Sequence, residues 1–150
     1  DLLPAADAEQ RQVPCLRAAI LLQQEKPGEA NEICRLVLDH DPWHPDAYLL
    51  LAMGYRQQGR VAEAVSALKQ AIYLRPQDPQ AHFFLGDTYR MLGLSVEARR
   101  EYENTLNILE RKGARPAETS TDPQAYANLT GVPDDLMRRA CRAHLSRSGQ

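Results

Sequence analysis

The sequence lacks the features that would place it in a membrane, secreted or nucleic-acid-binding class. No apolar run approaches the ~18 residues that a membrane span needs, and the longest one, at residues 49–53, is ended by Gly54. Cys15, Cys34 and Cys141 lie far apart and form no CxxC pair, which indicates reduced thiols in a cytoplasmic protein. The formal net charge is only -2, so the composition gives no electrostatic footprint for nucleic acid or an anionic membrane.

The start of the sequence also lacks targeting features. It opens at Asp1 without an initiator methionine, and no basic stretch is followed by an apolar core. We therefore expect no signal peptide within this chain, and we interpret the chain as an excised fragment of a longer protein. What is present is a 150-residue chain that is 43% hydrophobic and 25% charged, a composition typical of one globular domain.

A 34-residue period runs through the sequence. It separates Pro42 from Pro76, and Pro76 from a helix end expected near Glu110. Three columns of small or large residues keep the same phase over three copies, so the period indicates an internal repeat. The columns are Ala18, Ala52 and Gly86; Leu21, Tyr55 and Tyr89; and Ala30, Ala64 and Ala98.

The columns predict pairs of closely packed antiparallel helices. Small side chains let two helix backbones approach, and large ones fill the space beside them. Gly59 and Gly93 fall between the two helices of their copies, where positive φ ends the first helix. Pro45 and Pro79 suit first helical positions, and Asp78 can cap the helix that begins at Pro79.

The period and columns resemble the tetratricopeptide repeat. The resemblance implies an all-α fold, a right-handed solenoid of helical hairpins with three repeats and a C-terminal capping helix. The middle copy matches all eight signature positions, whereas the third has His82, Thr105 and Glu110 at three of them, and we expect His82 to pack in the core. In the first copy, Pro14 and Arg17 replace bulky apolar residues. The matching residues are Tyr48, Leu51, Ala52, Tyr55, Ala64, Leu68, Ala71 and Pro76, with Gly86, Tyr89 and Ala98 in the third copy.

The period divides the chain into segments. A helix is predicted to start near Pro14, and residues 122–131 read as the opening of a fourth repeat. The last helix, starting at Pro133, is interpreted as a cap rather than a detachable ligand-like helix. The segments are an N-terminal lead-in at 1–13, repeats at 11–44, 45–78 and 79–112, a linker with a partial helix at 113–132, and the capping helix at 133–147.

The resemblance places a binding groove on the first helix of each repeat. Some members of the family hold a C-terminal carboxylate there with Lys and Asn, but this chain has Leu49, Met53 and Phe83 instead, which predicts an apolar groove for a helix or peptide. The alternative is that the chain's own residues 122–145 fill the groove. The predicted groove residues are Leu16, Leu49, Leu50, Met53, Arg56, Phe83, Phe84, Asp87 and Arg90.

Catalytic groups do not converge in the sequence. Cys15 is not paired with an activating histidine in its repeat, and Pro42 breaks any helix that would align His40 with His44 as metal ligands. A thiol or metal hydrolase is therefore disfavoured. We expect no catalytic residues, metal or cofactor, and no enzyme activity in this chain.

Residues 70–145 resemble, more narrowly, the C-terminal repeat region of CheR-type chemoreceptor methyltransferases. The similarity lies in residues 71–76, 81–86 and 98–106. It implies a regulatory or docking arm of an S-adenosylmethionine-dependent enzyme whose catalytic domain lies outside this chain, with a chemoreceptor or that domain as partner. The alternative is a repeat scaffold from an unrelated assembly or secretion protein. Neither function involves nucleic acid or membrane insertion.

Overall fold

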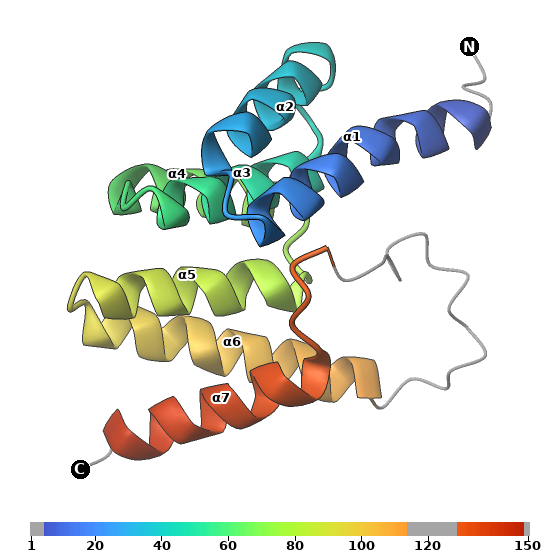
Figure 1. Ribbon diagram of the computed structural model, residues 1–150. Helices are drawn as coiled ribbons and strands as arrows, with labels where there is room; N and C mark the ends of the chain where they lie inside the picture. Colours follow the sequence, from blue (N-terminus) through green and yellow to red (C-terminus); the bar gives the residue numbers. More distant parts are fainter. Residues whose placement is uncertain (1–4, 114–128, 149–150) are drawn as a thin grey trace. The chain divides into compact units, whose positions relative to one another are not determined.

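A computed structural model describes residues 5–113 and 129–148, with side chains for 12–112 and 129–147. The described residues form seven α-helices and contain no strand (Figure 1). The chain divides into two compact units, an N-terminal unit at Asp1–Leu74 and a C-terminal unit at Arg75–Gln150. The all-α fold class predicted from the sequence is confirmed.

The N-terminal unit consists of two helical hairpins. Helices α1 (Ala5–Gln23) and α2 (Pro27–His40) form the first, and α3 (Pro45–Gln57) and α4 (Val61–Leu74) form the second. Helix α3 packs on α2 and also on α1, so the second hairpin covers one side of the first. Stacking of this kind buries apolar faces that a single hairpin would leave in water.

The C-terminal unit consists of one hairpin and a further helix. Helices α5 (Pro79–Met91) and α6 (Ser95–Gly113) form the hairpin, and α7 (Asp134–Ser148) packs mainly on α6 and also on α5. Helix α7 therefore takes the place on α5–α6 that α3 takes on α1–α2. Met137 and Cys141 are fully buried on α7, so this helix covers the hairpin as the capping helix was expected to do.

Proline and capping side chains start the helices of the repeats. Pro27, Pro45 and Pro79 stand in the first turn, where a missing N–H costs no hydrogen bond. The Asp78 carboxylate accepts a 2.9 Å hydrogen bond from the Gln80 N–H, which confirms the predicted cap.

The turns inside the hairpins share one backbone conformation. Gly59 and Gly93 have φ of 75° and 77°, and the equivalent residue of the first repeat, Glu25, has φ of 59°. A residue with a Cβ is strained in this left-handed region, whereas glycine adopts it freely. The first hairpin thus carries a strain that the other two avoid.

Gly86 on α5 sits directly against α6. A Cβ built on Gly86 would lie 3.0 Å from two ring carbons of Tyr102 and 3.4 Å from the Ala98 carbonyl oxygen. The buried Tyr102 ring therefore needs a glycine opposite it. In the second hairpin the same two positions hold Ala52 and Leu68, both completely buried.

Three sequence-based boundaries were wrong. Helix α1 begins at Ala5, not near Pro14, and Pro14 lies inside it. Ala, Glu and Gln before Pro14 are good helix formers and continue the helix across the missing hydrogen bond. Pro133 precedes α7 instead of beginning it, and α6 runs past Glu110 to Gly113. Most of the predicted linker and partial helix lies outside the described residues.

Candidate functional site

The predicted groove residues of α1 and α3 have very different exposures. Leu49 and Leu50 are buried in the core, Met53 and Arg56 are half-buried, and Leu16 of α1 is 43% exposed. The apolar groove members on α3 are therefore largely covered within the chain. Among the predicted groove residues of this unit, Leu16 has the most exposed apolar side chain.

On α5 the groove residues also separate into buried and accessible groups. Phe83 and Phe84 are buried and meet edge to face with their ring centroids 5.3 Å apart, and Phe83 also contacts the Tyr102 ring. Asp87 is half-buried and Arg90 is exposed. The described part of the 122–145 segment lies on this unit, since Thr130 donates a 2.8 Å hydrogen bond to the Gln80 side chain on α5. Binding of a partner at these positions stays a prediction.

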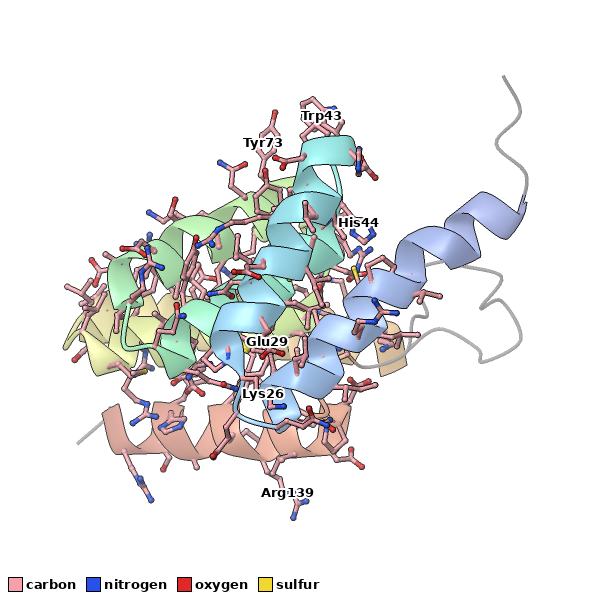
Figure 2. The ribbon with its side chains drawn as sticks, turned by 45° about the horizontal axis from the view of Figure 1, so that its top comes forward. Lys26, Glu29, Trp43, His44, Tyr73 and Arg139 are labelled. Atoms are coloured by element: carbon pink, nitrogen blue, oxygen red, sulfur yellow. The ribbon has the colours of Figure 1, made fainter. Side chains whose placement is uncertain are left out.

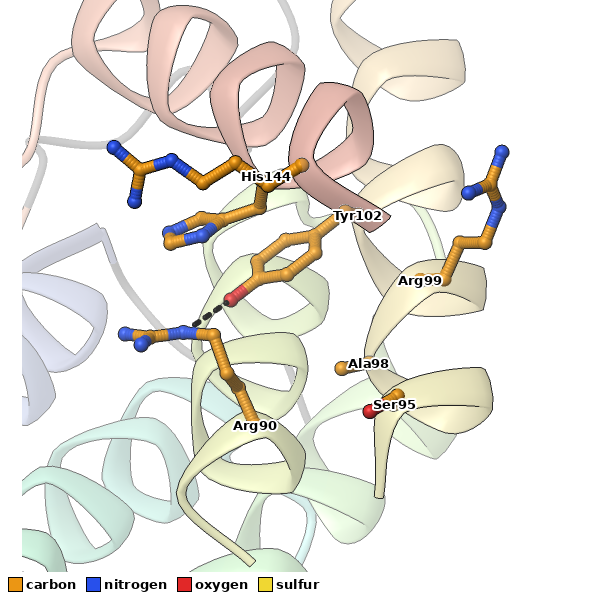
Figure 3. Close-up of a pocket in the computed structure, with 7 residues that line it drawn as sticks. Arg90, Ser95, Ala98, Arg99, Tyr102 and His144 are labelled. Atoms are coloured by element: carbon orange, nitrogen blue, oxygen red, sulfur yellow. Dashed lines mark hydrogen bonds between the residues drawn. The ribbon is translucent and has the colours of Figure 1, made fainter. Parts of the chain in front are cut away.

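Helix α7 brings a histidine over a polar cluster that sequence reasoning did not find. The Tyr102 hydroxyl donates a 2.5 Å hydrogen bond to Asp87, and the Arg90 Nε donates to the Tyr102 oxygen at 3.3 Å. The His144 ring stacks on Tyr102 with centroids 4.9 Å apart, and its Nε2 lies 4.0 Å from an Asp87 oxygen (Figure 3). Burial and the hydrogen bond to Asp87 raise the pKa of Tyr102, so its hydroxyl stays protonated.

A pocket of about 300 Å³ opens beside this cluster. Burial lowers the pKa of His144, and the nearby charges of Arg90 and Arg147 lower it further, so the imidazole is neutral at pH 7. The ends of α5 and α7 and the start of α6 bring the walls together. The lining residues are Arg90, Ser95, Ala98, Arg99, Tyr102, His144 and Arg147.

Sequence reasoning found no activating histidine for Cys15, but the structure places His44 of the same repeat beside it. The Sγ of Cys15 lies 3.8 Å from Nε2 of His44, a contact that joins α1 to the start of α3. Figure 2 shows Trp43 projecting outward whereas His44 turns toward α1. Sequence reasoning weighed His44 only as a metal ligand and missed that it is the N-cap of α3, with its Nδ1 accepting a hydrogen bond from the Ala47 N–H.

This cysteine–histidine pair is not arranged for nucleophilic catalysis. Since Nδ1 of His44 accepts a backbone hydrogen bond, neutral His44 carries its proton on Nε2, the atom that faces the thiol. Burial, with the charge of Asp46 second, raises the pKa of Cys15 to about 12, so the thiolate is not formed at neutral pH. The pair is suited to packing between α1 and α3.

The two histidines that precede α3 differ in burial. His44 is buried whereas His40 is exposed, so the two imidazoles do not share a face. Within residues 5–113 and 129–148, no group of three or more His, Cys, Asp or Glu is placed to hold a metal ion. In the same residues no helix combines the length and apolarity that crossing a bilayer requires.

His82 is buried as expected, but in a polar contact that the sequence did not indicate. Its Nδ1 lies 2.6 Å from a Glu101 oxygen and its Nε2 lies 2.8 Å from the Pro76 carbonyl oxygen. Burial alone would lower the pKa of His82, but the hydrogen bonds to Glu101 and Pro76 outweigh burial and raise it. Both ring nitrogens face acceptors, which favours the doubly protonated imidazolium.

An apolar stripe remains exposed on α1. Val13, Leu16 and Ile20 recur at helical spacing, and each is about half exposed. The stripe, defined by these three residues, includes one of the predicted groove positions. It is an apolar surface on a first helix of the repeat array, where the sequence predicted binding.

Comparison with known proteins first places the chain among proteins built of tandem helical hairpins. Residues 21–82 match the family model described as "Tetratricopeptide repeat", which supports the predicted membership of this repeat family. The matched region includes the hairpin α3–α4, which carries seven of the eight signature positions of the middle copy, and Pro76, which follows α4. No curated protein matches the sequence.

Several solved structures share the fold. The type III secretion translocator chaperone SycD of Yersinia enterocolitica is 12% identical, with a TM-score of 0.69 over 95% of this chain and 88% of that one. PcrH in complex with the chaperone-binding region of PopD is 15% identical, with a TM-score of 0.73 over 98% and 94%. The second repeat domain of Spaghetti (RPAP3), bound to an HSP90 peptide, is 22% identical, with a TM-score of 0.63 over 69% and 95%. The narrower resemblance to chemoreceptor methyltransferases receives no support from these comparisons.

Proposed function

We propose that this chain is a protein-interaction scaffold that binds a protein or peptide segment and performs no catalysis itself. The observation that carries the proposal is the half-exposed stripe of Val13, Leu16 and Ile20 on α1. Leaving such a stripe in water costs about 25 cal/mol per Å² of apolar surface, and an apolar segment of a partner would remove that cost.

The type of scaffold proposed is one of assembly or secretion. Structures with this fold include a secretion translocator chaperone and repeat domains holding a segment of another protein. The docking arm of a chemosensory methyltransferase rests only on the sequence resemblance of residues 70–145. A cytoplasmic location is part of the proposal, since the three buried cysteines are unpaired thiols.

Selection of peptides from a displayed library against the folded chain tests this function. Recovered peptides are expected to bind saturably by calorimetry, and Leu16→Glu should weaken that binding at least about tenfold by placing a carboxylate in the stripe. Leu36→Glu on α2 is the matched control, because Leu36 is 62% exposed in the same unit and lies outside the stripe. Equal thermal midpoints of both variants would show that folding is intact.

Two results would contradict the proposal. One is that selections on the folded chain yield no peptide that binds saturably. The other is equal loss of binding in Leu16→Glu and Leu36→Glu, which would remove the stripe as the cause. Calorimetric titration with S-adenosylmethionine is expected to show no binding heat. Saturable binding of that methyl donor would favour the methyltransferase function over the scaffold proposed here.

A further inference from the structure

The pocket of the C-terminal unit is a second candidate binding site, distinct from the stripe on α1. Arg90 comes from the last turn of α5, Ser95 begins α6, and His144 and Arg147 come from the end of α7. Its volume of about 300 Å³ is at the lower limit for ligand sites and accommodates one or two side chains of a partner. The walls are helices, so the site is formed in the folded unit.

Positive charge is concentrated in this pocket although the chain as a whole carries a net charge of -2. Arg90 is partly balanced by Asp87, at 3.7 Å. Arg99 is paired with Glu103 at 3.2 Å, and Figure 3 shows its guanidinium pointing away from Tyr102. Arg147 forms no ion pair with any residue that the structure describes. The pocket thus retains about one uncompensated positive charge.

The groups beside Arg147 are suited to an anion. Arg90 and Arg147 line the same pocket as His144, and the Asp87 carboxylate, 4.0 Å from His144 Nε2, offsets part of their charge. The first N–H groups of α6, at Ser95, have no partners within that helix and present positive partial charge, although Glu97 in the same turn offsets part of it. Guanidinium groups bind carboxylates with short, charge-assisted hydrogen bonds.

The turn between α5 and α6 adds an apolar rim. Arg90 and Ser95, which line the pocket, flank this turn in sequence. The large apolar side chains of this turn and of the residues adjoining it are all at least about two-fifths exposed, so apolar surface is available next in sequence to the pocket-lining Arg90 and Ser95. The rim consists of Met91, Leu92, Leu94 and Val96.

We propose that this pocket binds the carboxylate of an Asp or Glu side chain in a protein partner, with an adjacent apolar residue of that partner resting on the rim. The proposal rests on the proposed function as a protein-binding scaffold, and adds an anchoring site that combines Arg90, a predicted groove residue, with residues of α6 and α7 that the sequence did not indicate. The one uncompensated positive charge of the pocket, on Arg147, is balanced by the one negative charge of a carboxylate. Attachment to an anionic membrane typically takes clusters of four to eight basic residues, and nucleic acid takes several phosphate contacts.

Fluorescence anisotropy with a labelled peptide tests the site. The probe carries two Glu followed by two Leu, and its counterpart has Gln in place of both Glu. The wild-type chain is expected to bind the acidic probe at least tenfold more tightly than the Gln peptide, and Arg147→Glu should weaken binding of the acidic probe tenfold or more. In nuclear magnetic resonance spectra the ring signals of His144 should shift as the acidic probe is added.

Arg139→Glu is the matched control. Arg139 lies on the same helix, is exposed, and points away from α5 and α6 in Figure 2. Because Arg139→Glu and Arg147→Glu make the same change in net charge, a purely long-range effect would weaken binding equally in both. Unchanged affinity in Arg139→Glu supports the pocket, and an equal loss in the two variants overturns it.

The remaining outcomes separate this proposal from the proposed function. If library peptides bind wild type and Arg147→Glu equally while Leu16→Glu loses them, the scaffold stands and the pocket assignment is overturned. Equal affinity for the Glu and Gln probes also overturns it. So does Arg147-dependent binding of inorganic phosphate, or of vesicles containing an acidic phospholipid, without binding of the acidic probe.

Discussion

The hairpins α3–α4 and α5–α6 occupy equivalent positions of the repeat but are held together by different chemistry. In α3–α4 two positions hold Ala52 and Leu68, both fully buried. In α5–α6 the same positions hold Gly86 and Tyr102, so a larger side chain on one helix is accommodated by a smaller one on the other. The sum of volumes is conserved while the individual residues change, as close packing requires.

The same two hairpins differ in polar content. Tyr48 and Ala71 of the second repeat correspond to His82 and Thr105 of the third. The Thr105 hydroxyl donates a 2.8 Å hydrogen bond to the Glu101 carbonyl oxygen, and His82 contacts the Glu101 side chain. At these two buried positions of the third repeat, hydrogen-bond partners therefore compensate the polar groups that depart from the repeat pattern.

The largest expected effect sharpens this comparison by removing the cover of α5–α6. Met137→Glu places a carboxylate at a fully buried position of α7 and should lower the free energy of unfolding by at least about 3 kcal/mol. Leu136→Glu, at a neighbouring residue that is 47% exposed, should change it by less than about 0.5 kcal/mol. Urea unfolding followed by circular dichroism measures both. Equal stabilities would mean that α7 is not a structural cap.

The next effect concerns the different side-chain volumes at the equivalent pairs Gly86–Tyr102 and Ala52–Leu68. Gly86→Ala should destabilise by about 1–3 kcal/mol, because the new methyl group meets the Tyr102 ring at 3.0 Å. Ala52→Gly at the equivalent position should cost about 1 kcal/mol through helix propensity. The double variant Gly86→Ala, Tyr102→Leu reproduces the α3–α4 pair and is expected to show favourable coupling in a double-mutant cycle. If the effects of Gly86→Ala and Tyr102→Leu on stability were additive, the two positions would not compensate each other in volume.

A smaller effect is expected from His82, and it depends on pH. Because the folded-state pKa of His82 lies above its ordinary value of 6.5, its contribution to stability is complete below about pH 6.5 and is lost as pH rises through the folded-state pKa. Glu101→Gln should lower stability by about 1–3 kcal/mol at pH 6 and flatten this pH dependence. Denaturant unfolding across the pH range measures it. Glu103→Gln, an exposed change on the same helix, should leave the pH dependence intact.

The smallest effect extends the comparison to the first hairpin. Glu25→Gly should stabilise the chain by about 0.5–1 kcal/mol, since glycine adopts the positive φ of this turn without strain. The reverse change at the equivalent turn, Gly59→Glu, should destabilise the chain by a similar amount. No atom lies within 4 Å of a Cβ built at Gly59, so the cost comes only from holding a residue with a side chain at positive φ. Thermal midpoints compare the two. The midpoint is expected to rise in Glu25→Gly and to fall in Gly59→Glu, and a change of the same sign in both would contradict the strain at Glu25.

Local rules predicted the hairpins, the Asp78 cap and the glycine turns of this fold. The 34-residue spacing fixes which residues repeat, and Pro45, Asp78 and Gly59 act on their own segments, so their effects can be predicted from neighbouring residues. Pro14 was misjudged because the strength of the flanking helix formers outweighed one missing hydrogen bond.

The polar contacts could not be predicted in the same way. The pairing of Cys15 with His44, of His82 with Glu101 and of His144 with Tyr102 depends on side-chain directions across helices. The last also depends on how α7 is rotated on α6, which its amphipathic pattern alone leaves open. The pocket containing Arg90 and Arg147 was missed for this reason, although Arg90 was a predicted groove residue.

The three buried thiols allow local opening of the helices to be measured by chemical modification of the native chain. Cys15, Cys34 and Cys141 lie on α1, α2 and α7 and are no more than 1% exposed, and burial raises the pKa of each to about 12. A thiol reagent therefore reacts only when the surrounding helix opens and the cysteine meets water. Reaction rates at the two N-terminal sites and at the C-terminal site report local opening free energies separately. The native sequence already holds probes in both units.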